Sequence, residues 1–291
     1  MAEQVTIKNE FLTVDISTLG AEIQRVKGAG GTEFLWNGDE AVWSGRAPIL
    51  FPICGGLKED KYVLEGREYT MFKHGFIKNK TFTVVTAEDA KAELVFCADE
   101  ETKKEYPYSF AFRVIFELTG NSLAVSYKVE NENGKTMYFS VGAHEAYACP
   151  DGIENYSVVF EKNETLDSYI LDGNLLEKNF IRVMENGTEF PLKYDYFQVD
   201  ALVFKSLQSR KVTLVHKNSA KKVTVSFPGH DFFLLWTKPT GRYICLEPWC
   251  GIPDGVDADF DFANKEGIIP LPAGETYTAV HTITLRNKLN D

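Results

Sequence analysis

The sequence predicts an all-β protein, a large antiparallel β-sandwich formed as a single domain over residues 1–291. Aromatic residues make up 13% of the chain, with 21 Phe and 13 Tyr, and such residues favour strands. Short segments that alternate apolar and polar residues recur between Gly and Asn turns, as in half-buried antiparallel strands. No long segment has the 3.6-residue period of a helix, and no repeat or low-complexity linker divides the chain. So many strands are expected to form two large stacked sheets.

The expected strands follow one another through short turns. A first hairpin pairs residues 11–16 with residues 21–26, and a second spans residues 62–69 with its turn at Glu65-Gly66. Further strands are expected at residues 81–85, 92–97, 110–118, 122–131, 137–141, 158–160, 169–171, 201–207, 212–216 and 223–227. The last hairpin joins residues 232–236 to residues 243–246 through a turn that contains Pro239 and Gly241. Glu247 is then the residue at the end of a strand that is expected to be buried.

Charge and composition exclude several classes of protein. The chain has 31 Lys and Arg against 42 Asp and Glu, a net charge of −11, which argues against nucleic-acid or anionic-membrane binding. Its first residues lack the pattern of a signal peptide, and no apolar run approaches the length of a membrane span. Five cysteines without a CxxC pair favour free thiols in a reducing compartment over a disulfide framework or a zinc site. We therefore expect a soluble, cytoplasmic protein.

Three titratable residues at strand–loop junctions are candidates for proton transfer. A buried carboxylate at Glu247 must find a partner or shift its pKa upward, and this is how a general base is made. Alternatively, Glu247 reaches water past the proline that follows it. His74 and His144 lie in two further segments of similar character, although a single loop histidine is more often structural. Together, the three residues have the side chains that acid–base chemistry requires.

Arg46 lies in an irregular segment, residues 43–56, that contains two prolines and three glycines. Such a rigid backbone can hold an arginine beside a cavity. Its guanidinium is suited to sugar hydroxyls or to an anionic group, and a surface ion pair is the alternative.

Four motifs occur in the order found in a known family. Arg46 lies next to Pro-Ile-Leu-Phe-Pro, His74 lies in Lys-His-Gly-Phe, His144 in Gly-Ala-His and Glu247 in Leu-Glu-Pro-Trp. In these motifs the chain resembles the aldose 1-epimerase (galactose mutarotase) family, and most closely a LacX-like subgroup, over nearly its whole length. The resemblance implies a galactose mutarotase-like supersandwich. It also implies interconversion of the α and β anomers of a sugar, without cofactor or metal.

The resemblance also implies roles for individual residues. Glu247 would remove the proton from the C1 hydroxyl, and His144 would protonate the ring oxygen. His74 would hold the ring oxygen or the C1 region, and Arg46 would bind hydroxyls. Asp200 resembles a sugar-binding aspartate of the family on a short match, and a turn carboxylate is the alternative. Ring opening needs an acid and a base at once, so we expect Glu247 and His144 to face each other across a gap as wide as a pyranose.

Aromatic residues beside these positions could face the C–H surface of a sugar. Trp43, Phe72 and Trp249 are the candidates, although aromatic residues of an all-β chain more often belong to the core. The remaining histidines are expected to be structural or exposed, and no metal-ligand spacing surrounds them: His216, His230 and His281.

Two departures from the family pattern leave the substrate open. His74 is followed by Gly-Phe-Ile-Lys78 where Gly-Phe-Ala-Arg is common, and His144 is followed by Glu145 where Pro is more usual. The same fold also hosts hexose-6-phosphate mutarotases, for which Arg46, Lys73 and Lys78 could bind a phosphate. The sequence is also compatible with a non-catalytic sugar-binding or sensing module, or with a purely structural sandwich. A binding module would not need both His144 and Glu247.

Overall fold

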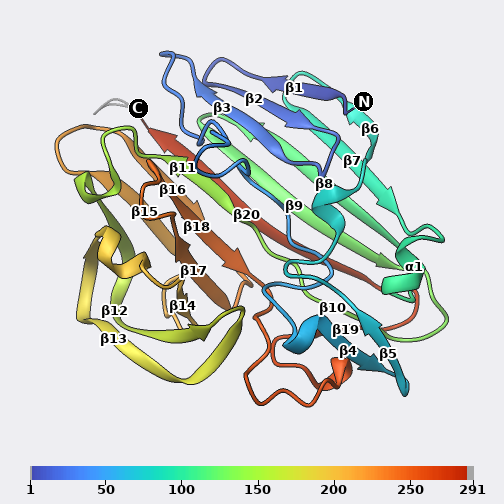
Figure 1. Cartoon of the computed structure of the whole chain (residues 1–291). Helices are drawn as coiled ribbons and strands as arrows, with labels where there is room; N and C mark the ends of the chain where they lie inside the picture. The colour runs from blue at the N-terminus through green and yellow to red at the C-terminus, as the bar shows by residue number, and fades with distance from the viewer. Residues whose placement is uncertain (1, 287–291) are drawn as a thin grey trace.

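Strands make up most of the molecule, which we describe from a computed structural model of residues 2–286 (Figure 1). The strands are β1 (Gln4–Lys8), β2 (Leu12–Ser17), β3 (Ile23–Gly28), β4 (Lys61–Leu64), β5 (Arg67–Thr70), β6 (Thr83–Ala87), β7 (Lys91–Cys97), β8 (Phe110–Thr119), β9 (Ser122–Asn131), β10 (Met137–Phe139), β11 (Glu145–Ala148), β12 (Tyr156–Asp172), β13 (Leu175–Pro191), β14 (Leu202–Phe204), β15 (Lys211–His216), β16 (Lys222–Ser226), β17 (Phe232–Trp236), β18 (Tyr243–Trp249), β19 (Ile269–Leu271) and β20 (Thr276–Arg286). The helical elements are α1 (Thr102–Glu105) and the 3-10 turns η1 (Lys58–Asp60), η2 (Ile77–Asn79), η3 (Ile153–Asn155), η4 (Tyr194–Phe197) and η5 (Phe262–Asn264).

One antiparallel sheet of 13 strands dominates the fold. Its order is β11-β18-β17-β14-β12-β15-β16-β20-β9-β8-β7-β6, and β13 pairs with β12 beside this path. The all-β antiparallel prediction is confirmed. The strands that were expected to form two large stacked sheets belong to one continuous hydrogen-bonded sheet. That sheet curls: Glu145 of the terminal strand β11 lies 2.8 Å from His281 of β20, far along the strand order.

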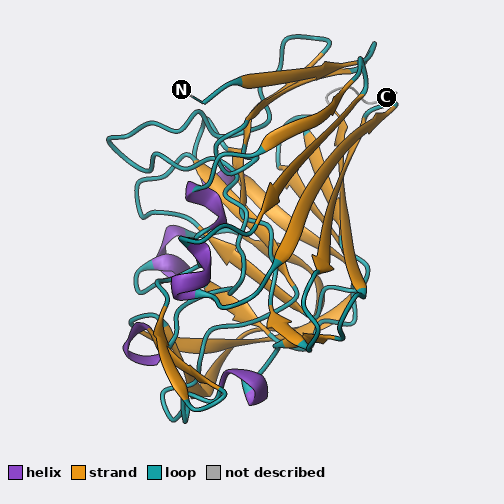
Figure 2. Cartoon of the chain, turned by 90° about the vertical axis from the view of Figure 1, so that its right-hand side faces the viewer, coloured by secondary structure: helices purple, strands orange, loops and turns teal. Residues whose placement is uncertain are grey.

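Smaller sheets and short turns complete the structure. The sheet β1-β2-β3 lies over the β6–β9 end of the large sheet, which it joins through the backbone hydrogen bond from Lys8 to Asp89 (Figure 1). Two-stranded pairs form between β4 and β5 and between β10 and β19. The short helices and most long loops lie on one side of the large sheet (Figure 2). Among residues 2–286, no helix has the length and apolarity needed to cross a bilayer.

The aromatic core holds the loops that form the site. Buried and half-buried residues alternate along β9, as expected for a strand with one face in the core. Phe51, from the irregular segment at residues 43–56, stacks on Phe112 of β8 with ring centroids 4.7 Å apart. Burial of one such side chain contributes about 1.5–3 kcal/mol. The Phe51 carbonyl also accepts hydrogen bonds from the N–H groups of Phe76 and Ile77, and so fixes the loop that carries His74.

Gly75 permits this close contact between the two loops. Its φ is +65°, and a Cβ built there would lie 2.3 Å from the Phe51 carbonyl oxygen. We expect Gly75→Ala to lower the free energy of unfolding by more than about 1 kcal/mol, through both the clash and the left-handed backbone. Urea unfolding would measure it, with Gly134→Ala as the control because nothing lies near that Cβ position. Equal stabilities of the two variants would contradict the prediction.

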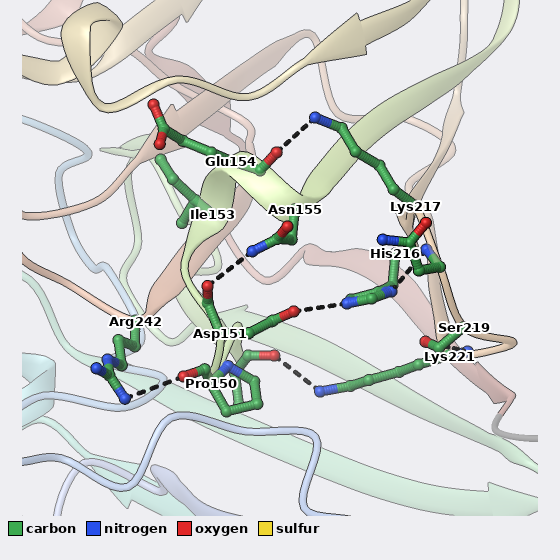
Figure 3. A network of polar contacts seen from close by, with 12 residues as sticks. Pro150, Asp151, Ile153, Glu154, Asn155, His216, Lys217, Ser219, Lys221 and Arg242 are labelled. Carbon is green, nitrogen blue, oxygen red and sulfur yellow. Dashed lines mark hydrogen bonds and ion pairs between the residues drawn. The ribbon is translucent and has the colours of Figure 1, made fainter.

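A polar network fixes the chain at the far end of β11 (Figure 3). His216 Nε2 lies 2.7 Å from Asp151 Oδ2, and Lys221 donates to the Ala148 carbonyl at 2.8 Å. Arg242 donates to the Pro150 carbonyl at 3.1 Å. These contacts join the segment after β11 to the β15–β16 hairpin and to the start of β18. His216 therefore has the structural position that the sequence predicts for it.

The other predicted turns and thiols agree with the structure. The Glu65-Gly66 turn joins β4 to β5, and β17 pairs with β18 as the expected last hairpin. All five cysteines are free, and only Cys97 is exposed.

Candidate active site

A cavity of about 710 Å³ opens beside β17 and β18. Six of the eight site residues expected from the sequence line its wall: Trp43, His74, His144, Asp200, Glu247 and Trp249. They come from segments that are far apart in the chain, and the curled sheet brings them together.

Glu247 lies in a strand whose residues are all buried, and its own exposure is 1%. It pairs with Leu234 of the neighbouring strand β17, and its side chain reaches the cavity wall. Burial raises the pKa of the Glu247 carboxyl well above its ordinary value, because desolvation disfavours the anion. The positive charge of Lys73 opposes that shift, and the negative charge of Asp200 adds to it. A carboxylate of raised pKa is a stronger base.

His144 directly precedes β11 and lies against Glu247. Its Nε2 is 3.4 Å from Glu247 Oε2. This corrects the expected pyranose-wide gap, because β11 pairs directly with β18 and so places the residue before β11 beside Glu247. Burial lowers the pKa of His144 to about 3, so a neutral imidazole is favoured there.

His74 is held in one tautomer by the backbone of Gly55. The N–H of Gly55 donates to His74 Nδ1 at 3.1 Å, so the proton of a neutral imidazole must be on Nε2. Burial lowers the pKa of His74 well below its ordinary value and keeps the ring neutral. The backbone of His74 has a φ of 70°, a conformation that few non-glycine residues adopt. His74 therefore offers an Nε2–H donor on the cavity wall.

Aromatic rings enclose the pair formed by His144 and Glu247. The ring centroids of Trp43 and His144 are 5.3 Å apart, and Trp236 meets His144 edge-on at 5.5 Å. Trp249 donates through Nε1 to the Ala143 carbonyl at 3.0 Å and so supports the residue before His144. Trp236 was not among the site residues predicted from the sequence. Its place in the predicted strand at residues 232–236 could have indicated it, because that strand forms a hairpin with the strand that leads to Glu247.

Cationic side chains form another part of the wall. Lys73 Nζ lies 3.7 Å from Asp200 Oδ2, and both residues line the cavity. Lys78 Nζ donates to the Lys73 carbonyl at 3.3 Å, and burial lowers its pKa. Further polar residues of the wall come from loops, turns and η2: Glu22, Asn79, Asn174 and Gln198.

Two predicted site residues do not line the cavity. The Arg46 guanidinium donates through Nε to the Asn37 carbonyl at 2.9 Å, and its Nη1 bonds Gln24. The backbone N–H of Arg46 donates instead to Glu22, which does line the wall. Phe72 is 69% exposed and does not line the cavity. Direct sugar contacts by these two side chains are therefore not supported by their positions.

One group of side chains could hold a metal ion. His144, Cys245 and Glu247 each offer a ligand atom, and these atoms all lie within 4.8 Å of one another. They are an imidazole, a thiol and a carboxylate, the donor types that Zn²⁺ accepts. Burial, however, raises the pKa of the Cys245 thiol well above its ordinary value, which disfavours the thiolate that binds metal. A metal bound here would also occupy both His144 and Glu247.

Comparison with known proteins identifies the family of this chain. A model of the family described as aldose 1-epimerase matches residues 3–284, and the chain belongs to that family. The LacX-like resemblance is also confirmed. Plasmid-encoded protein LacX of Lactococcus lactis subsp. lactis is 32% identical over 97% of this chain and 99% of its own length.

Solved structures show the same fold. A galactose mutarotase related enzyme from Lactobacillus acidophilus is 32% identical, with a TM-score of 0.93 over 98% of both chains. A galactose mutarotase-like protein from Lactobacillus casei ATCC 334 is 27% identical, with a TM-score of 0.91 over 98% of this chain and 100% of its own. The galactose mutarotase-like fold expected from the sequence is thus confirmed.

Proposed function

We propose that this protein is a cofactor-independent mutarotase, which interconverts the α and β anomers of a hexose or a closely related sugar. One observation carries the proposal: Glu247 and His144 lie 3.4 Å apart on the wall of a cavity of about 710 Å³. A base and an acid so close can serve two oxygens of one carbon atom. Membership of the aldose 1-epimerase family supports the same class of reaction.

The proposed reaction moves one proton back and forth through the sugar. In the reactive form Glu247 is an anion and His144 is protonated. Glu247 takes the proton of the C1 hydroxyl, the bond between C1 and the ring oxygen breaks, and His144 gives its proton to that oxygen. Rotation about the C1–C2 bond then presents the other face of the aldehyde. The steps run in reverse on that face, so the pair recovers its starting form.

The surroundings of the pair suit such an exchange. The pair holds one proton throughout, so the buried cavity never has to accommodate an added net charge, which desolvation would disfavour. His74 donates its Nε2–H to the ring oxygen or the C1 region, where negative charge develops. Trp43 and Trp249 supply apolar faces for the C–H surface of the sugar. No covalent intermediate is needed.

Mutarotation itself is the direct test. Polarimetry or NMR would follow the α-to-β conversion of freshly dissolved glucose and galactose, with and without the protein. We expect conversion well above the spontaneous rate. A protein that binds these sugars, by NMR titration, without accelerating conversion would be a binding module and would contradict the proposal.

A phosphorylated sugar is a second candidate substrate, favoured by Lys73 and Lys78. Lys78 is a partly buried cation on the cavity wall whose hydrogen bond goes to a backbone carbonyl. Such a cation is suited to an anionic group of the ligand.

The role of Lys78 can be tested by changing the sugar. If the substrate has a phosphate, Lys78→Gln is expected to lower kcat/KM for glucose 6-phosphate about tenfold or more and to leave glucose unaffected, since a charge-assisted hydrogen bond contributes about 1.5–3 kcal/mol. Lys80→Gln is a matched control because Lys80 lies over the Phe76 ring outside the cavity wall. Equal effects on both sugars would assign Lys78 to support of the loop.

Independence from metal is also open to test. We expect dialysis against a strong chelator to leave kcat unchanged, because the proposed proton transfers use only side chains. Added Zn²⁺ is expected to inhibit, since it would bind the donors of His144 and Glu247. Loss of activity on chelation, restored by one metal, would overturn this part of the proposal.

A further inference from the structure

A second carboxylate–imidazole pair lies in the interior, behind the acid–base pair. Glu145 Oε1 is 2.8 Å from His281 Nε2, and the side chains are 3% and 0% exposed. Glu145 is the first residue of β11, and His281 lies in β20, on the facing part of the curled sheet. The pair thus bridges two parts of the sheet across the core.

The Glu145–His281 pair is adjacent to both His144 and Glu247 in the sheet. Glu145 follows His144 directly, and successive side chains of a strand point to opposite faces. The register partner of Glu145 in β18 is Leu246, the residue before Glu247. His144, just before β11, and Glu247 of β18 therefore face the cavity, and Glu145 contacts His281 on the other face of the sheet. Movement of either strand would change the 3.4 Å separation on the cavity side.

Stability alone does not account for a polar pair in this place. Burying a carboxylate with one hydrogen bond is costly, and apolar side chains of similar volume often give equal or greater stability. Glu145 Oε2 and His281 Nδ1 have no hydrogen-bond partner among the described residues. What the pair provides, which apolar packing does not, is one directional contact between β11 and β20.

We propose that Glu145 and His281 are positioning residues that hold His144 and Glu247 at their working separation from behind. This inference rests on the proposed mutarotase function. Glu145 and His281 together form the contact.

The charge of Glu145 affects the pKa of Glu247, and a purely structural role would not produce such an effect on the pH–rate profile. The charge of Glu145 raises the pKa of Glu247, beside the larger effect of burial. The titratable groups around the pair are Tyr127, His144, Tyr147, His230, Cys245 and Glu247. Removing a negative charge lowers the pKa of each neighbouring acid. Both limbs of the pH–rate profile, which belong to the His144–Glu247 pair as a unit, should then move to lower pH.

The test compares Glu145→Gln with a distant pair of the same kind. We expect Glu145→Gln to lower kcat about tenfold to a hundredfold, as small displacements of reacting groups do. KM should change less than kcat, and the pH–rate profile should move to lower pH. Asp151→Asn is the control, since Asp151 makes a similar contact with His216 at the other end of β11. The control should keep the wild-type kcat and profile.

Measurements of stability, of a double variant and of the Glu247 pKa separate a positioning role from a purely structural one. A lower melting temperature with wild-type kcat and pH profile would overturn the proposal and leave the pair purely structural. If Glu145→Gln does not fold, the double variant Glu145→Leu with His281→Leu restores apolar packing. Its kcat and pH–rate profile are then compared with those of the wild type in the same way. Should the wild type show no turnover, the proposed function fails. An NMR titration of Glu247 in wild type and Glu145→Gln then tests the pair alone, and an unchanged pKa would overturn it.

Discussion

Replacing Glu247 by glutamine is expected to lower kcat for mutarotation by about 10²–10⁴-fold, the usual contribution of a positioned general base. Glutamine matches glutamate in size and keeps a polar group at the cavity wall, but it cannot take the proton of the C1 hydroxyl. Binding of the sugar uses other contacts, so KM should change little. Polarimetry on fresh sugar across a range of concentrations would separate the two constants.

The fold of this variant should be intact, and stability measurements provide the check. Because burial holds the pKa of Glu247 above its ordinary value of 4.5, the folded state favours the protonated carboxyl. The wild type therefore loses stability as the pH rises from 4.5 through the raised pKa. Glu247→Gln should lack that loss and be at least as stable as the wild type near neutral pH. Unchanged turnover in a folded variant would remove Glu247 from the mechanism.

The alternation of apolar and polar residues predicted the strands well, and the lack of such alternation explains why the long strand β13 was not predicted. The expected strands at residues 122–131, 212–216 and 223–227 correspond closely to β9, β15 and β16. The short strands expected at residues 158–160 and 169–171 are parts of one long strand, β12, and its partner β13 was not predicted. Most of β13 is exposed on both faces. A strand without a buried face has no apolar period to detect.

The site was predictable as a set of residue types, and its geometry was not. Glu247 could be placed at a buried strand from its apolar neighbours alone. That His74 and His144 meet it came from the resemblance, because only long-range topology brings these segments together. Arg46 shows the limit: residues 43–56 do form an irregular segment that borders the cavity, but the side chain bonds Asn37 and Gln24. Side-chain direction in a loop depends on contacts that local sequence does not encode.

Removing the imidazole of His144 is the other change for which we expect a large effect. His144→Gln should lower kcat by about 10²–10⁴-fold, because the ring oxygen would lose its proton donor. The pH–rate profile should also lose one of its two limbs, since only Glu247 of the pair would titrate. A bell-shaped profile that survives in the variant would assign the second limb to another group.

Acid stability gives an independent check on the state of His144. Burial lowers its pKa from 6.5 to about 3, so the unfolded chain binds a proton at this residue before the folded protein does. The wild type should therefore lose stability as the pH falls from 6.5, by up to about 1.4 kcal/mol for each pH unit. His144→Gln removes this contribution, and urea unfolding at about pH 7 and about pH 4.5 should show a smaller acid loss than in the wild type. Equal losses in both proteins would mean that the imidazole of the folded protein already has a proton at neutral pH, with Glu247 as its anionic partner.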